Sequence, residues 1–296
     1  MKILITGCNG FIGSNLLSFL KKKKIDTIGW DISQTSNQNC RKIDMLNLDE
    51  VKRSLLFDKP TTIIHCAGAA DVNKSFLNPQ LDYMLNVSIT NNLIIASSNV
   101  KEIKEFVFLS SASVYGNPDH LPIDESCPIN PLSPYALHKA MAEDICKYYS
   151  ANYQTNVKII RIFSAYGKGL KKQIFWDVFQ RYKETGHLSF WGTGKESRDY
   201  IYISDLINAI WLIAKKANQN DIIFNVGNGK EVFMSDIATL YSKYLKCKPD
   251  ENLFNNVSKP GIPINWRADI SKLKSLGYKQ RISFEEGLKD YIDWLK

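Results

Sequence analysis

Two side chains able to exchange a proton with a substrate, Tyr135 and Lys139, stand four residues apart. On a helix this spacing places both on one face. A tyrosine, with a pKa of about 10, is a poor base at neutral pH, and a lysine ammonium one turn away favours the phenolate. Ser111 follows a predicted strand and could hold a substrate oxygen while Tyr135 takes its proton. We therefore expect Ser111, Tyr135 and Lys139 to form an acid–base site.

A Tyr-x-x-x-Lys pair is common on ordinary helices, so its meaning depends on the first segment of the chain. Residues 1–13 read MKILITGCNGFIG, a short apolar strand followed by glycines in a G-x-x-G-x-x-G pattern and the start of an amphipathic helix. Glycines there let the backbone turn tightly and approach a pyrophosphate, which binds the free N–H groups of the helix. The residues expected to bind a dinucleotide here are Gly7, Gly10, Phe11, Ile12 and Gly13.

A carboxylate at the end of the second predicted strand, Asp31, indicates which dinucleotide binds. It lies about 20 residues beyond the glycine turn, where it can accept hydrogen bonds from the ribose hydroxyls and would repel a 2′-phosphate. NAD is therefore favoured over NADP. The alternative is an ordinary loop aspartate at a strand end. Asp44 follows a third short strand and is expected near the adenine.

Further strands alternate with helices along the first half of the chain. Residues 61–68 form a buried strand that runs into small residues, including Ala67, where a cofactor would pass. A helix over 81–98 carries Asn86, and the next strand ends in a serine cluster at 110–116. Ligands of open α/β sheets bind at such carboxyl ends. The fold class is therefore α/β, a Rossmann-type doubly wound parallel sheet.

Composition limits the partners. The chain has 296 residues, 44% of them hydrophobic, and a net charge of +8. The only dense basic run, Lys21 to Lys24, complements a helix C-terminus, so we expect a solvated helix end, no nucleic acid partner and an anionic small substrate. The most apolar stretch, 206–214, is too short to span a membrane, and no signal peptide is expected.

Cysteine and histidine usage points to a reducing compartment and to no metal site. The six cysteines share no spacing, so reduced thiols and a cytoplasmic location are expected. The four histidines are equally scattered, so no metal ligand set is predicted; they are His65, His120, His138 and His187.

Taken together, these motifs resemble the extended short-chain dehydrogenase/reductases, and more closely their nucleotide-sugar epimerase/dehydratase branch. The resemblance runs nearly end to end. It is carried by the glycine turn, Ser111, Tyr135 and Lys139, and by further segments at 86–90, 110–116, 161–169, 192–200, 224–227, 268–272 and 276–278.

The resemblance implies NAD as the cofactor and a nucleotide-diphosphate sugar as the substrate. It adds Ala67, Asn86, Tyr135 and Lys139 to the cofactor contacts. The residues matching substrate contacts of the family are Ser111, Ser113, Ser164, Trp191, Arg198 and Lys259.

Some of these positions depart from the family pattern. Ser164 stands where an asparagine is common, and Lys259 where many members have a second phosphate-binding arginine. Lysine keeps the charge but not the bidentate fork. For Trp191, core packing is an equal alternative to packing near the base.

The resemblance also implies a division of the chain. Residues 1–168 would form the NAD-binding domain, with 198–227 returning to it, and 169–296 a smaller, discontinuous substrate-binding part. The helices near 84–98 and 135–151 would form a homodimer surface.

Three functions stay open. The first is an NAD-dependent nucleotide-sugar 4-epimerase that passes through a 4-keto sugar. The second is an NAD(P)H-dependent reductase of a nucleotide-linked 4-keto-6-deoxyhexose, which the short chain and Ser164 favour. The third is a non-catalytic cofactor sensor, which the complete triad disfavours. Dehydration is not expected, because Ala112 and Ser113 replace the Asp-Glu pair of similar sugar dehydratases.

Overall fold

Within the residues that the computed structural model describes (1–34, 39–153, 155–247, 253–257, 261 and 263–296), seven parallel strands form one sheet. Their order is β10-β6-β5-β4-β1-β2-β3, with every neighbouring pair parallel. The strands are β1 (Lys2–Thr6), β2 (Asp26–Asp31), β3 (Cys40–Lys42), β4 (Thr62–His65), β5 (Glu105–Ser111), β6 (Asn156–Ile162) and β10 (Ile223–Val226).

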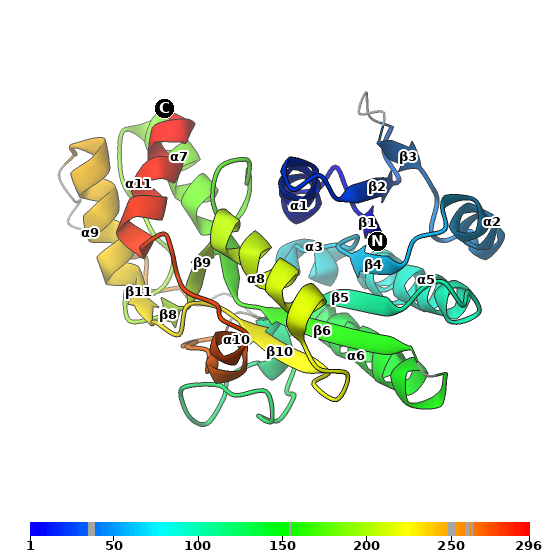
Figure 1. Cartoon of the computed structure of the whole chain (residues 1–296). Coiled ribbons are helices and arrows are strands. Elements are labelled where there is room, and N and C mark those ends of the chain that lie inside the picture. Colours follow the sequence, from blue (N-terminus) through cyan, green and yellow to red (C-terminus); the bar gives the residue numbers. More distant parts are fainter. Residues whose placement is uncertain (35–38, 154, 248–252, 258–260, 262) are drawn as a thin grey trace.

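Helices cover both faces of this sheet (Figure 1). On one face α1 packs against α8; on the other, α5 packs against both α2 and α6. The bounds are α1 (Phe11–Lys22), α8 (Ile203–Lys216), α2 (Leu48–Asp58), α5 (Ile89–Ser98) and α6 (Pro134–Asn152). Parallel strands joined by helices on both faces make a doubly wound α/β fold, so the predicted fold class is confirmed.

Alternation along the strands explains the two helix layers. In β1, Ile3 and Ile5 belong to the core under α1 and α8, whereas Leu4 belongs to the core under α2, α5 and α6. In β5, Val107 belongs to the core under α1 and α8, and Phe108 belongs to the core on the opposite face. Successive side chains of a strand point to opposite faces, so an apolar residue at every position produces a sheet with two buried faces.

The helix predicted over 81–98 consists of several consecutive segments. A short helix α3 (Val72–Leu77) is followed by α4 (Pro79–Tyr83), a π-helical turn η1 (Met84–Ser88) and then α5. Asn78 caps α4 by accepting a hydrogen bond from the backbone N–H of Leu81 at 3.0 Å. The sequence predicts a helix here but does not distinguish the wider π turn from an ordinary α-helical turn.

The remaining elements form a smaller part to one side of the sheet (Figure 1). Two short two-stranded sheets and four helices build it among the described residues. They are β7 (Ser164–Tyr166), α7 (Gln173–Thr185), β8 (Ser197–Arg198), β9 (Tyr200–Tyr202), β11 (Val232–Phe233), α9 (Met234–Leu245), α10 (Ser271–Ser275) and α11 (Phe284–Leu295). Between β9 and β11 the chain returns to the large sheet as α8 and the edge strand β10.

No helix among the described residues combines the length and the apolar character that crossing a membrane requires.

A buried ion pair fixes α6 on the sheet. The Nη2 atom of Arg161 in β6 lies 2.6 Å from Oε2 of Glu143 in α6, and both side chains are buried. Ser110 Oγ donates to Glu143 Oε1 at 2.6 Å, and Arg161 Nη1 donates to the Tyr115 hydroxyl at 2.9 Å. Burial alone would lower the pKa of Arg161, but hydrogen bonding and attraction to Glu143 raise it above its ordinary value. Each of the two buried charges is compensated by the other, so removing either side chain would leave a buried charge without a partner.

We expect Glu143→Ala to lower the free energy of unfolding by about 3–5 kcal/mol, because it leaves the Arg161 guanidinium buried without a counter-charge. Urea denaturation measures the loss. The matched control is the next residue, Asp144→Asn, whose carboxylate pairs with Lys147 but is 73% exposed. That change should cost at most about 1 kcal/mol. Equal, small losses for the two variants would contradict a dominant role for the buried pair.

Candidate active site

The first wall of the candidate site is the glycine turn between β1 and α1. Gly7 has φ +67°, and a side chain there would place its Cβ 2.8 Å from the backbone of Ala67, the small residue that follows β4. A Cβ on Gly13 would lie 2.1 Å from the Gly7 carbonyl oxygen. Only glycine therefore fits at both positions, and the turn closes against the end of β4 as the G-x-x-G-x-x-G pattern requires. Gly10 directly precedes Phe11 and Ile12, the half-buried first residues of α1.

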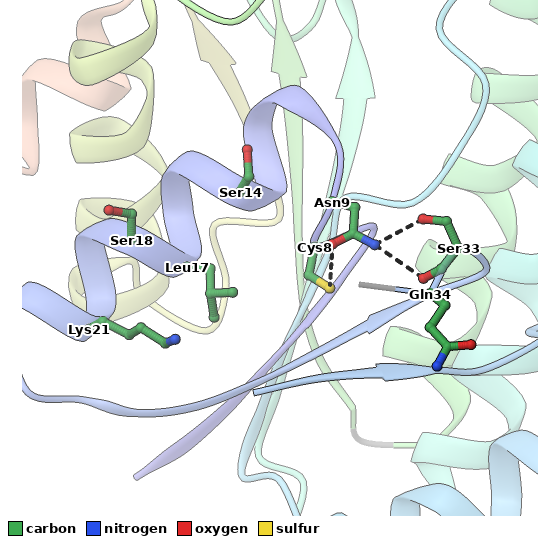
Figure 2. A pocket seen from close by; sticks show the side chains of 8 residues that line it. All are labelled: Cys8, Asn9, Ser14, Leu17, Ser18, Lys21, Ser33 and Gln34. Carbon is green, nitrogen blue, oxygen red and sulfur yellow. Dashed lines mark hydrogen bonds between the residues drawn. The ribbon is translucent and has the colours of Figure 1, made fainter. Parts of the chain in front are cut away.

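Asp31 at the end of β2 faces this turn. Its carboxylate accepts hydrogen bonds from the backbone N–H of Asn9 at 3.0 Å and from the Ser33 hydroxyl at 2.7 Å. The Asn9 side chain donates in turn to Ser33 (Figure 2). Asn9, Ser33 and Ser14 are among the residues lining a cavity of about 580 Å³ beside the turn. Asp31 is thus held at the turn rather than free in a loop.

Asp44 lies beyond β3, where its carboxylate oxygen Oδ1 accepts a hydrogen bond from the backbone N–H of Leu46 at 3.0 Å. It shapes the turn into α2 and is half-buried. Its expected contact with the adenine stays a prediction.

The second wall is the end of β4 with the π-helical turn. Asn86 is buried in that turn and donates through Nδ2 to the carbonyl of Asp82 at 3.1 Å, whereas its Oδ1 has no hydrogen-bond partner among the described residues. A Cβ on Gly68 would lie 2.8 Å from Asn86 Oδ1 and 3.4 Å from Lys139 Nζ. The glycine therefore lets both polar groups approach one place. Single π turns of this kind are frequent at functional sites.

The three candidate catalytic residues come together at the end of β5. Ser111 ends that strand, and Tyr135 and Lys139 lie on the first turns of α6, whose N-terminus is capped by Ser133. The Ser111 side chain lies close enough to the Tyr135 hydroxyl to act on its pKa. Lys139 Nζ donates to the carbonyl of Leu109 at 3.0 Å. The structure thus places Tyr135 and Lys139 on the same turns of α6, as their spacing predicted, and brings them to the end of the strand that carries Ser111.

The expected lowering of the Tyr135 pKa is wrong for this structure. Burial raises the pKa of Tyr135 to about 12, although the Ser111 side chain acts in the opposite direction. Burial also lowers the pKa of Lys139 to about 8, and the Asp82 carboxylate opposes that shift. The Lys139 ammonium donates to the Leu109 carbonyl. Burial of Tyr135 and of Lys139 affects the two pKa values more than the attraction between an ammonium and a phenolate does.

The residues expected to contact the substrate differ in how far their side chains are buried. Ser113 is buried, its backbone N–H donates to Ser111 Oγ at 3.1 Å, and its own hydroxyl has no hydrogen-bond partner among the described residues. Ser164 is half-buried in β7, where its N–H donates to the Asp199 carbonyl at 2.9 Å. Trp191 is 41% exposed, which excludes the alternative of core packing.

Arg198 in β8 is half-buried and bound on one side by backbone carbonyls. Its Nη2 donates to Pro263 at 2.6 Å, its Nη1 to Ile264 at 2.9 Å, and the guanidinium lies 5.3 Å from the centroid of the Trp266 ring. Those contacts fix the plane of the guanidinium. Lys259, expected as its partner, lies outside the described residues.

The sequence analysis missed Asp82 and His138. The Asp82 carboxylate lies 2.7 Å from His138 Nδ1, and both side chains are buried, so the pair ties α4 to the catalytic helix next to Lys139. The two residues are 56 positions apart, and no local pattern relates them.

Comparison with known proteins places this site in a family. The sequence profile of the NAD dependent epimerase/dehydratase family matches residues 3–227. A putative UDP-glucose 4-epimerase from Methanocaldococcus jannaschii is 32% identical over 99% of this chain and 98% of its own length.

Solved structures agree along the whole chain. The UDP-glucose 4-epimerase of Thermotoga maritima, crystallised with UDP-glucose, superposes with a TM-score of 0.91 at 25% identity and covers 100% of this chain and 98% of that one. The UDP-glucuronic acid 4-epimerase of Bacillus cereus, in complex with UDP-glucuronic acid and NAD, gives 0.90 at 27% identity over 100% and 99%. The predicted resemblance is confirmed, and the chain belongs to the NAD dependent epimerase/dehydratase family.

Proposed function

We propose that this protein is an NAD-dependent nucleotide-sugar 4-epimerase. The observation that carries the proposal is the grouping of Ser111, at the end of β5, with Tyr135 and Lys139 on the first turns of α6. Family membership supports an enzyme of this class, and the three similar proteins described above are named as UDP-glucose or UDP-glucuronic acid 4-epimerases.

The residues present fit NAD. The glycine turn leaves room for a pyrophosphate where any side chain would collide with backbone, and Asp31 offers a carboxylate for the ribose hydroxyls. Asn86 Oδ1 is a buried acceptor without a partner among the described residues, beside Lys139. Gly7, Gly10, Phe11, Ile12, Gly13, Asp31, Ala67 and Asn86 would hold the cofactor, with Tyr135 and Lys139 at its reactive end.

In this reaction the side chains of the protein would transfer a proton at one hydroxyl of the sugar. Ser111 would hold the oxygen at C4 while Tyr135 takes its proton, and Tyr135 would return it when the hydroxyl is restored. Bound NAD would supply the hydride acceptor and donor for C4. The positive charge of Lys139 would act against the burial that raises the pKa of Tyr135, and so would favour the tyrosine anion that this transfer needs.

We infer that the substrate is a nucleotide-diphosphate sugar. Arg198 would bind the diphosphate with the donors that its backbone contacts leave available, and Lys259 would add a second charge. Ser113, Ser164 and Trp191 would line the sugar and base positions. With Ala112 and Ser113 in place of an acid–base pair, we do not expect dehydration.

We further infer a homodimer formed through the helices near 84–98 and 135–151, together with the adjoining α4, located in the cytoplasm. Apolar side chains are exposed on these helices, among them Leu81 and Leu137, each 47% exposed, and Met141 and Tyr148. A second copy is the partner whose matching face would cover them. The six cysteines are present as thiols, which is consistent with a reducing compartment.

Replacing Tyr135 by Phe should lower kcat by at least about 100-fold, because only the transferable proton is lost. NAD affinity, measured by calorimetry, should stay nearly unchanged. Tyr148→Phe on the exposed face of the same helix is the control and should keep full activity. Turnover near the wild-type value in Tyr135→Phe would remove Tyr135 from the chemistry.

NAD should bind more tightly than NADP, and Asp31→Asn should reduce this preference, because the charge that repels a 2′-phosphate is lost. Calorimetric titration of both cofactors into the cofactor-free protein measures the ratio. Asp26→Asn, at the exposed start of the same strand, should leave the ratio unchanged. Tighter binding of NADP by the unaltered protein would show that Asp31 does not select the cofactor.

The reductase alternative is separated from the epimerase by the fate of the cofactor. An epimerase restores its cofactor in each cycle, so purified protein should carry NAD and interconvert a 4-epimeric pair of nucleotide sugars without added cofactor. Chromatography of the sugar nucleotides, with absorbance recorded at the NADH band, tests this. Stoichiometric NADH loss with a 4-keto sugar, and no epimer formed without NADH, would identify a reductase.

A further inference from the structure

One group of potential metal ligands lies outside the catalytic machinery, on the loop between the 3-10 helix η2 (Ala112–Tyr115) and α6. His120, Asp124 and Cys127 each direct one ligand atom to a common point, and these atoms all lie within 4.8 Å of one another. His120 Nε2 is 3.7 Å from Cys127 Sγ. The spacing is His-x3-Asp-x2-Cys.

These separations are close to those around a tetrahedral ion. With bonds of about 2.3 Å to sulfur and about 2.0 Å to nitrogen, two ligand atoms on one zinc ion are roughly 3.5 Å apart. The observed distance between nitrogen and sulfur is already 3.7 Å. Only the carboxylate needs to move, by about 1 Å, and a side-chain rotation provides such a shift.

The loop is held in place before any ion binds. The Ile123 N–H donates to the Arg267 carbonyl at 2.7 Å, and the Asp269 N–H donates to the Ile123 carbonyl at 2.7 Å. Glu125 Oε1 accepts from the Asn225 N–H at 2.9 Å. Three bonds to two distant segments, 267–269 and Asn225, hold the residues on both sides of Asp124, so the ligands lose little freedom when they bind a metal.

The carboxylate of the cluster is oriented by hydrogen bonds. Asp124 Oδ1 accepts from the Ser126 N–H and hydroxyl, which leaves Oδ2 for a metal. The negative charge of this carboxylate would attract a divalent ion.

We propose that His120, Asp124 and Cys127 bind a zinc ion, with water in the fourth position. Imidazole, carboxylate and thiolate are all zinc ligands, and the mixture of hard and soft donors suits this borderline-soft ion. His120 is exposed and gives the ion access, whereas Cys127 is buried. The ion would cross-link the loop that leads into the catalytic helix. Counting histidines along the sequence missed the cluster, because only one of its ligands is a histidine.

Binding has a defined proton balance. The Cys127 thiol loses its proton as the sulfur–zinc bond forms, and His120 and Asp124 bind in their neutral and ionised forms. One proton is therefore released for each ion bound near neutral pH, and no oxidant or reductant is involved. Affinity should rise with pH, because the thiol must ionise.

The first test uses the untagged full chain and Co²⁺ as a spectroscopic probe for zinc. We expect a thiolate-to-cobalt charge-transfer band that Zn²⁺ abolishes. Cys127→Ser should remove the band, whereas Cys247→Ser, which replaces a half-buried cysteine outside the cluster, should retain it. Absence of the band in the unaltered protein, or its persistence in Cys127→Ser, would overturn the proposal.

The second test measures Zn²⁺ binding by calorimetry in two buffers of different ionisation enthalpy, which yields the number of protons released. His120→Gln and Asp124→Asn should each weaken binding by more than about 10-fold. Because both side chains are at least partly exposed, these variants should fold even if Cys127→Ser does not. His187→Gln, at another exposed histidine, is the control and should bind like the unaltered protein. Equal affinities in His120→Gln and His187→Gln would contradict the site. Neither test depends on epimerase activity.

Discussion

The position of the catalytic helix depends on one buried ion pair, Glu143 with Arg161. Glu143 lies one turn beyond Lys139 on α6, and its carboxylate also accepts from Ser110, the residue directly before Ser111. Helix α6, which carries Tyr135, and strand β5, which ends at Ser111, are thus joined at a second point by the contact between Glu143 and Ser110. Because neither charge can be left unpaired in the interior, α6 has little freedom to slide along β5. The distance between Ser111 and Tyr135 is therefore set by a structural contact outside the chemistry.

The strand order determines where a ligand can enter. From β1 the chain builds outward through β2 and β3, then returns to the other side of β1 as β4. The connection that leaves β1 and the connection that leaves β4 therefore run toward opposite edges of the sheet. Such a reversal of strand order opens a crevice at the carboxyl ends of the strands. Gly7 after β1 and Ala67 after β4 meet at this point, and the glycine makes the contact sterically possible. The glycine turn follows β1, and Ser111 ends β5, the strand next to β4.

Burial drives both catalytic groups toward their uncharged forms. It raises the pKa of Tyr135 to about 12 and lowers that of Lys139 to about 8. The buried Asp82 carboxylate, held by His138, supports the charge on Lys139. A close spacing of tyrosine and lysine therefore does not by itself produce a phenolate. The proton affinity of the site is determined by the full set of surrounding groups.

The sequence by itself determined the first strand, turn and helix, the pairing of Tyr135 with Lys139 and the α/β class, because these depend on spacing over a few residues. The family followed from the same motifs in their order along the chain. Only the tertiary structure decided the contacts between Glu143 and Arg161 and between Asp82 and His138, the π turn that carries Asn86, and the direction of the Tyr135 pKa shift. The physical reason is that burial and long-range pairing arise from segments tens of residues apart, whose packing no local pattern records.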